Sequence, residues 1–337
     1  MQLESKIAMI ETECAMSCLV GGNYRWGEVS LRKGIVMKKI LVTGGTTFVS
    51  KYAAQYFVNQ GYDVNVLNRN SKPQVDGVTL IEGDRHNLGD ALKDMHFDAV
   101  VDITAYDACD INDLLDALGS FEQYIMVSSG AVYPDLRDVS ISEEASKSFN
   151  AFTGSYGMGK AEAEDALLER VPNAYILRPA YLYGAMNNLY REAFVFDCAK
   201  ANRKFYLPGD GKMKLQFFHV RDLCRLMDVI VKEKPADHIF NVGNVELVSI
   251  RDWVTKCYAC FGKNPEFVNV FENIKPRYYF CFDSNEYYLD VQRLNKIFAD
   301  TIPLDEGLKE AAEWYVAHED EVNKKPYFDY IDLNLKL

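Results

Sequence analysis

The sequence has no apolar run approaching the roughly 18 residues that a membrane-spanning helix needs. No signal-peptide pattern opens it either, so we expect a cytoplasmic protein with no membrane partner. Positive charge is scarce, because 37 Lys and Arg are outnumbered by 49 Asp and Glu. The resulting net charge of −12 argues against broad affinity for nucleic acid, which depends on neutralising phosphates.

Metal-binding patterns are also missing. The eight cysteines are scattered, and no second Cys pair or His pair stands at zinc spacing. The one Cys-x-x-Cys runs from Cys257 to Cys260, and Cys257 shares a helical face with Trp253 and Phe261. We therefore expect reduced thiols, with Cys257 buried, and no metal cofactor.

The sequence can form a large hydrophobic core, because 48% of its 337 residues are hydrophobic. From Met37 onward, short apolar segments alternate with amphipathic helical patterns, which predicts an α/β protein with a doubly wound parallel sheet. The expected strands are Lys39–Thr43, Asp63–Leu67, Val78–Ile81, Ala99–Ile103, Gln123–Val127, Ala174–Leu177 and Ile239–Gly243.

This alternation breaks down after Arg178, which predicts two interleaved domains. We expect residues 37–180 to form a Rossmann nucleotide-binding domain, rejoined by about 216–248. Residues 181–215 and 249–330 then form a smaller C-terminal substrate domain, or cap. Residues 1–36 lack periodicity, and we expect them to be an extension that precedes a natural start at Met37.

A glycine turn lies between the first strand and the first helix, in Thr43–Ser50. Backbone N–H groups at such a place hold the pyrophosphate of a dinucleotide, although an ordinary glycine turn is the alternative. Asn68 and Arg69 end the second strand with an amide and a guanidinium, which favours NADP over NAD because both can bind a ribose phosphate. The expected contacts at the turn are Gly44, Thr46, Thr47, Phe48 and Val49.

Tyr156 and Lys160 are four residues apart, so they share one face of a helix. A lysine beside a tyrosine favours the phenolate and lowers the pKa of the phenol, which suits acid/base catalysis near neutral pH. Alone, this spacing is common by chance. Its position after the fifth strand makes it a candidate catalytic pair.

Together with the strand motif Tyr124–Tyr133, these features resemble the NAD(P)-dependent epimerase/dehydratase family of extended short-chain dehydrogenases/reductases, over roughly Met37–Asp320. The resemblance implies Ser129 as the catalytic hydroxyl, Tyr156 as the acid/base and Lys160 as the anchor of the nicotinamide ribose. It also implies a homodimer. The further cofactor contacts that it implies are Asp84, Thr104 and Pro179.

The sequence departs from the family pattern at two cofactor positions, where Thr47 and Ser50 replace glycines of Gly-x-x-Gly-x-x-Gly. Gly130 and Ala131 follow Ser129 where the family's dehydratases carry acidic residues. Because neither can transfer a proton, we expect no dehydratase activity. An epimerase and a plain carbonyl reductase both remain open.

The substrate implied by the resemblance is a sugar nucleotide, as in UDP-glucose 4-epimerases, or a related hydroxyl or carbonyl compound. Here too the sequence departs, with Tyr181 in place of an asparagine and Leu215 in place of a phosphate-binding arginine. The bases that could substitute for that arginine are Lys214, Arg203, Lys204 and Arg277.

The segments Leu67–Arg69, Gly83–Arg85 and Phe240–Gly243 resemble the subgroup of the chloroplast stem-loop-binding proteins. That subgroup includes RNA-binding proteins on an epimerase fold. The alternative hypothesis is therefore an RNA-associated protein, favoured by the basic run from Arg191 to Lys214 and opposed by the net charge.

Overall fold

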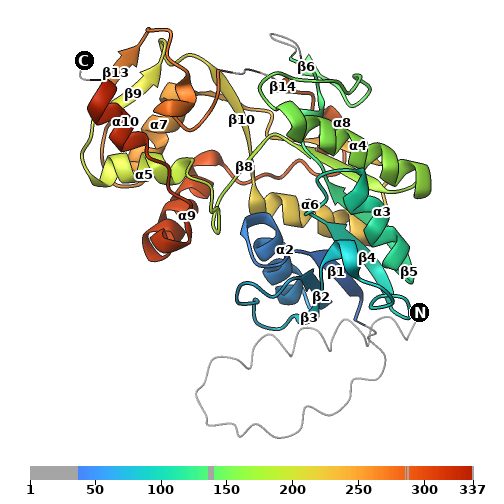
Figure 1. Cartoon of the computed structure of the whole chain (residues 1–337). Helices are drawn as coiled ribbons and strands as arrows, with labels where there is room; N and C mark the ends of the chain where they lie inside the picture. The colour runs from blue at the N-terminus through green and yellow to red at the C-terminus, as the bar shows by residue number, and fades with distance from the viewer. Residues whose placement is uncertain (1–36, 136–139, 285, 287, 336–337) are drawn as a thin grey trace, which may run out of the picture. The chain divides into compact units, whose positions relative to one another are not determined.

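The computed structural model describes residues 37–135, 140–284, 286 and 288–335. The expected extension, residues 1–36, lies outside this part of the chain. Among the described residues, no helix is both long and apolar enough to cross a membrane. A seven-stranded sheet forms the centre of the fold (Figure 1). Its strands are β1 (Lys39–Thr43), β2 (Asp63–Asn68), β3 (Thr79–Glu82), β4 (His96–Asp102), β5 (Ser120–Val127), β7 (Tyr175–Pro179) and β11 (Ile239–Val242).

The strand order is β11-β7-β5-β4-β1-β2-β3, and every neighbouring pair is parallel. Successive strands therefore run outward from β1 in both directions, and the order reverses between β1 and β4. In doubly wound sheets, ligands bind at this reversal, beyond the carboxyl ends of the strands. The predicted fold class is confirmed.

Helices cover both faces of this sheet. On one face, α2 (Phe48–Asn59) and α6 (Val220–Glu233) bury side chains such as Phe57 and Leu226 against the strands. On the other, α3 (Ala108–Ala117) and α4 (Gly154–Arg170) bury side chains such as Leu114 and Leu167. Successive residues of a strand point to opposite faces, so Leu41 and Val42 lie on different faces of the sheet. Both are fully buried because helices cover both faces.

A second group of elements gathers at one end of the molecule and buries its own aromatic core, which contains Trp253 stacked on Phe217 (Figure 1). The segment from 216 to 248 is divided. The strand β10 (Lys214–His219) pairs with the shorter strands β8 and β12 of this group. The elements α6 and β11 that follow β10 belong to the large sheet and its covering helices. The elements of this group are β8 (Tyr181–Tyr183), α5 (Glu192–Lys200), β9 (Phe205–Pro208), β10 (Lys214–His219), β12 (Leu247–Ser249), α7 (Ile250–Ala259), β13 (Phe267–Val270), α9 (Leu304–Ala317) and α10 (Tyr327–Asn334).

Short connecting elements complete the described chain. The strands β6 (Ser140–Ile141) and β14 (Tyr288–Leu289) pair with each other. The remaining short helices are η1 (Arg85–Asn87), η2 (Gly130–Val132), η3 (Pro276–Tyr278), α8 (Gln292–Asn295) and η4 (Glu319–Glu321). Cys257 is fully buried in α7, as expected, and the six cysteines of the described residues are free thiols.

Candidate cofactor and catalytic site

A cavity of about 1060 Å³ opens at the carboxyl ends of the strands, at the reversal of strand order. It extends from the glycine turn, past the ends of β4 and β5, to residues of the C-terminal group. Of the predicted site residues, Lys214 and the alternative bases Arg203 and Lys204 do not line it. Those that line it are Gly44, Thr46, Thr47, Phe48, Val49, Asn68, Arg69, Asp84, Thr104, Ser129, Tyr156, Lys160, Pro179, Tyr181 and Arg277.

The turn after β1 depends on Gly44, which has a φ of +89°. A Cβ atom there would lie 2.8 Å from Oγ of Ser50 and 3.0 Å from Cγ2 of Thr104. No other residue fits this conformation and space without a shift of its neighbours. Ser50, which stands where the family has a third glycine, uses the space beside Gly44 and donates its hydroxyl to the carbonyl of Thr47 at 2.9 Å.

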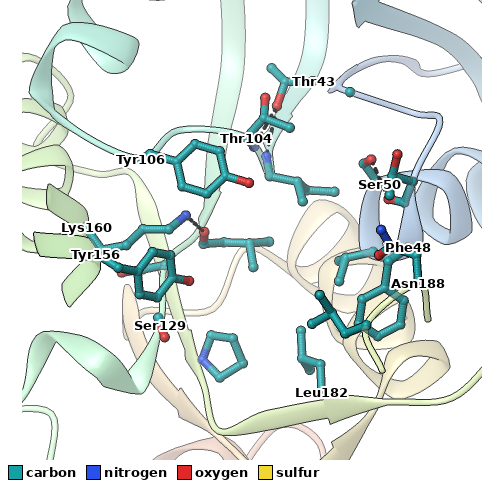
Figure 2. A pocket seen from close by; sticks show the side chains of 18 of the residues that line it. Thr43, Phe48, Ser50, Thr104, Tyr106, Ser129, Tyr156, Lys160, Leu182 and Asn188 are labelled. Atoms are coloured by element: carbon teal, nitrogen blue, oxygen red, sulfur yellow. Dashed lines mark hydrogen bonds between the residues drawn. The ribbon is translucent and has the colours of Figure 1, made fainter. Parts of the chain in front are cut away.

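The N-terminus of α2 is left open toward the cavity. Thr47 has an extended backbone, with a φ of −146°, so a glycine is not required at this second departure from the family pattern. Its side chain forms no capping hydrogen bond with the first turn of α2. Phe48 has a φ of +36°, which is strained for an aromatic residue and sets its ring at the cavity wall (Figure 2). The open helix terminus and the space that Gly44 keeps clear fit a dinucleotide pyrophosphate.

The end of β2 has two roles. The amide of Asn68 donates to the carbonyl of Gly44 at 2.6 Å, so it holds the glycine turn in place. Arg69, by contrast, is exposed at the cavity rim, together with Lys72. At the end of β3, Asp84 accepts a hydrogen bond from the backbone N–H of His86 at 3.1 Å and caps η1. This rim can thus offer two cations to a phosphate.

The helix of the candidate catalytic pair, α4, packs closely against the segments after β4 and β5 because of two glycines. A Cβ atom at Gly157 would lie 2.3 Å from the carbonyl oxygen of Ala131, and one at Gly159 would lie 2.5 Å from that of Tyr106. These approaches lock the turn of helix that carries Tyr156 and Lys160 against the loops after β4 and β5.

Tyr156, Lys160 and Ser129 lie on one wall of the cavity, across from Phe48 and the start of α2 (Figure 2). The phenol of Tyr156 forms a hydrogen bond with Ser129. The buried ammonium of Lys160 donates to the carbonyl of Ala105 at 2.6 Å and to that of Val127 at 2.9 Å. Ser129 also accepts the N–H of Ala131 at 3.1 Å, which orients its hydroxyl.

The protonation of these groups differs from the sequence-based expectation. Burial lowers the pKa of Lys160 to about 8, although the carboxylates of Asp102 and Asp110 oppose this. The pKa of Tyr156 is raised, because partial loss of hydration in the cavity, where the residue remains 45% exposed, outweighs the hydrogen bond from Ser129. The expected lowering by Lys160 is therefore not seen, since the ammonium is directed at two backbone carbonyls rather than at the phenol.

Sequence reasoning missed an aromatic residue of this wall. Tyr106 is 55% exposed, and its ring lies 5.0 Å from the ammonium of Lys160 and 6.4 Å, between centroids, from the ring of Tyr156. The face of an aromatic ring stabilises a nearby cation. No sequence pattern indicates this role, because Tyr106 lies in the irregular segment between β4 and α3.

Behind the wall lies a buried charge network that was also missed. Asp102 is fully buried and accepts hydrogen bonds from Arg85 at 2.8 Å, from Tyr124 at 2.6 Å and from Thr43 at 2.7 Å. Burial alone would raise the pKa of Asp102, but Arg85 and the hydrogen bonds outweigh it, and the pKa is lowered. The network ties the ends of β1, β4 and β5 together under the cavity.

The substrate end of the cavity is basic and aromatic. Arg191, which the sequence analysis placed only in a basic run, lines it and stacks its guanidinium over Tyr181 and Phe282, at 5.2 and 5.7 Å from their ring centroids. Within the described residues it forms no ion pair. Arg277 lines the cavity too, near Asp283 at 3.8 Å.

Lys214 does not reach the cavity. It begins β10 as an exposed residue, whereas the next residue, Leu215, is buried in the aromatic core. Leu215 is unavailable to any ligand as well.

Comparison with known proteins agrees with this geometry. The model of the NAD dependent epimerase/dehydratase family matches residues 40–243. The chain belongs to this family. The predicted resemblance is confirmed.

Among curated proteins, the chain is 31% identical over 248 residues to the chloroplast stem-loop binding protein of 41 kDa b of Arabidopsis thaliana, covering 68% of this chain and 64% of that protein. It is 23% identical over 323 residues to a trifunctional UDP-glucose 4,6-dehydratase/UDP-4-keto-6-deoxy-D-glucose 3,5-epimerase/UDP-4-keto-L-rhamnose-reductase of the same plant, covering 82% of this chain and 47% of that protein. The chain thus spans less than two thirds of the length of either relative.

Solved structures share the fold. The UDP-glucose 4-epimerase of Thermotoga maritima, with UDP-glucose, superimposes with a TM-score of 0.68 at 19% identity, over 83% of this chain and 99% of that one. The UDP-glucuronic acid 4-epimerase of Bacillus cereus, with UDP-glucuronic acid and NAD, gives a TM-score of 0.65 at 18% identity, over 83% and 99% of the two chains.

Proposed function

We propose that the protein is an NAD(P)-dependent epimerase or carbonyl reductase that acts on a sugar nucleotide or a related hydroxyl or carbonyl compound. The observation that carries this proposal is the placement of Tyr156, Ser129 and Lys160 in the same cavity as the open terminus of α2. A dinucleotide held at that terminus and a substrate held near Arg191 would both have access to the phenol.

When bound, the nicotinamide accepts or donates a hydride. Side chains of the protein carry out the rest of the step. Tyr156 exchanges a proton with the reacting oxygen, and Ser129 donates a hydrogen bond that stabilises charge on that oxygen. Lys160 stays protonated below about pH 8 and offers its cation to the ribose. The raised pKa of Tyr156 favours the protonated phenol, which can give its proton to a carbonyl oxygen as the hydride arrives. In the reverse direction, oxidation of a hydroxyl, the phenolate would accept the proton.

The cofactor proposed is NADP rather than NAD. Arg69 and Lys72 at the rim support it, because a ribose phosphate would lie between two cations, whereas Asn68 is already committed to the glycine turn. Titrating NADPH and NADH while following nicotinamide fluorescence tests this. Arg69→Ala should weaken NADPH by about tenfold and leave NADH unchanged, consistent with loss of one charge-assisted contact.

Dehydration is excluded from the proposal for a local reason. Gly130 and Ala131 form η2 directly after Ser129, and neither carries a proton to transfer. Among the described residues that line the cavity, the carboxylates are Asp84, Asp110 and Asp283, all outside this helix. Incubation with UDP-glucose and UDP-galactose distinguishes the two remaining activities, since an epimerase interconverts them without net consumption of cofactor.

An RNA-associated role is the second candidate, supported by the similarity to the chloroplast stem-loop binding protein. The basic run from Arg191 to Lys214 supports it less than the sequence suggested, because Lys200, Arg203 and Lys204 each pair with a carboxylate. Filter binding of structured RNA across a salt series tests this role. An RNA-associated role requires that the affinity for RNA fall steeply as the salt concentration rises.

A homodimer through the helices beside α4 also remains part of the proposal. Light scattering coupled to size exclusion tests it, with a mass of twice 38.4 kDa expected.

A further inference from the structure

Three side chains of different chemistry converge outside the catalytic wall, next to the end of the cavity formed by Asp84. Cys109 and Asp113 are four residues apart on α3, so they share one helical face. His86 reaches them from η1. The Nδ1 atom of His86 lies 2.7 Å from Oδ2 of Asp113 and 4.0 Å from Sγ of Cys109, and Sγ lies 3.3 Å from the same Oδ2.

We propose that His86, Cys109 and Asp113 form a binding site for a divalent cation of the zinc type. A nitrogen, a sulfur and a carboxylate oxygen are the donors that zinc uses. In a tetrahedral zinc site with bonds of 2.0–2.3 Å, neighbouring donors are roughly 3.3–3.8 Å apart. Two of the three distances here are within a few tenths of an ångström of that range. The third distance, 2.7 Å between Nδ1 of His86 and Oδ2 of Asp113, would increase when an ion replaces the hydrogen bond between these two atoms. Both side chains have room to move, because they are 51% and 35% exposed.

A second observation supports this site, because His86 is oriented from behind. Its other ring nitrogen, Nε2, lies 3.3 Å from Oδ1 of Asp110. Metal-binding histidines usually place their remote N–H beside a carboxylate, which fixes the tautomer and leaves the other nitrogen free to bind. Asp110 is itself held firmly, since it is 7% exposed and its Oδ2 accepts the backbone N–H of Tyr106 at 2.7 Å.

The surrounding charge favours a cation. Asp84 holds the backbone of His86 at 3.1 Å, and Asp107 and Asp116 flank the three donors along α3. Two arginines are nearby, and both face other carboxylates: Arg85 pairs with Asp102 at 2.8 Å and lies 3.7 Å from Oδ1 of Asp110, and Arg170 pairs with Asp116 at 2.7 Å. With three protein donors at an exposed position, the fourth coordination place is open to water or to a ligand.

The site is next to the cofactor cavity, since His86 and Asp110 also line that cavity. A bound ion would therefore fix the loop that carries Asp84. This inference goes beyond the proposed function and does not depend on it, because metal binding can be measured without cofactor or substrate.

Titration of the untagged full chain with Co²⁺ tests the proposal. We expect one equivalent to produce the visible absorption of tetrahedral cobalt and a near-ultraviolet band from the cobalt–thiolate bond. Cys109→Ser should abolish the thiolate band, and Asp113→Asn should weaken binding by at least about tenfold. Zn²⁺ should displace the cobalt and remove both signals.

Two matched variants serve as controls. Cys260→Ser removes a partly buried thiol from the residue that follows α7. His96→Ala removes an exposed histidine from a separate cluster, which also contains Asp98 and Glu122. Both should leave the spectrum unchanged. The proposal is overturned if one equivalent of Co²⁺ gives no thiolate band, if Cys109→Ser retains the band, or if His96→Ala abolishes binding.

Discussion

The buried ion pair between Glu164 and Arg178 gives a sharp test of how α4, the helix that carries Tyr156 and Lys160, is held in place. Glu164 in α4 is fully buried, and Arg178 in β7 is 3% exposed. The guanidinium donates from Nη2 at 2.6 Å and from Nε at 3.0 Å, and the hydroxyl of Ser128 donates to the same carboxylate at 2.5 Å. The pair therefore joins the helix of Tyr156 to the ends of β5 and β7.

Glu164→Ala leaves the guanidinium buried without its counter-ion. Removal of one partner from such a pair costs about 3–5 kcal/mol, compared with a total stability of about 5–15 kcal/mol for a typical domain. The assay is urea denaturation, with the free energy of unfolding taken from the midpoint and slope. The control is Glu162→Ala, an exposed residue of the same helix, which should change stability by no more than about 0.5 kcal/mol.

Replacing both partners, with Glu164→Leu and Arg178→Met together, removes the buried charge instead of leaving it without a counter-ion. This double variant should be more stable than Glu164→Ala alone. The reasoning is refuted if Glu164→Ala unfolds within about 1 kcal/mol of the Glu162→Ala control.

Three further predictions concern the cavity. Gly44→Ala should destabilise the protein by about 1–3 kcal/mol and abolish dinucleotide binding, whereas Gly61→Ala, with a similar φ of +81° but no atom within 4 Å of its Cβ, should cost less and leave binding unchanged. Dinucleotide affinity should fall as pH rises through about 8, because Lys160 loses its proton there, and Lys160→Met should remove this dependence. Asp102→Asn should be less stable than the unmodified chain at neutral pH. Because the folded pKa of Asp102 is lowered, the difference should persist above its unfolded pKa of about 3.9 and shrink as pH falls below that value, as measured by denaturation at each pH.

The large sheet could be predicted because its strands have a strong local signal. Strands covered on both faces are continuous apolar runs, and β1 was predicted at its observed bounds, with β2 and β11 within one residue at the end. The weaker β3, whose side chains are partly exposed, was predicted one residue early. The cap was harder, because β9 and β13 owe their structure to pairing with each other across some 60 residues of intervening chain.

The residues of the candidate site also differ in how well the sequence could predict them. Residues directly after strands, such as Gly44 and Ser129, could be placed because parallel strands present their carboxyl ends at one edge. Tyr106 and Arg191 could not, since both stand in irregular segments and meet the cavity only through the folded chain. Lys214 was predicted near the substrate because it is next to Leu215, but it is the exposed first residue of β10 and does not line the cavity.

The most direct test of the account is turnover by Tyr156→Phe. This variant keeps the ring and removes the hydroxyl that is proposed to exchange the proton. With UDP-glucose, UDP-galactose and a panel of carbonyl substrates, in the presence of NADPH or NAD, turnover should fall by roughly 10²- to 10⁴-fold, while dinucleotide binding stays within about twofold of the unmodified chain. Undiminished turnover by Tyr156→Phe on a substrate that the unmodified chain converts would contradict the account.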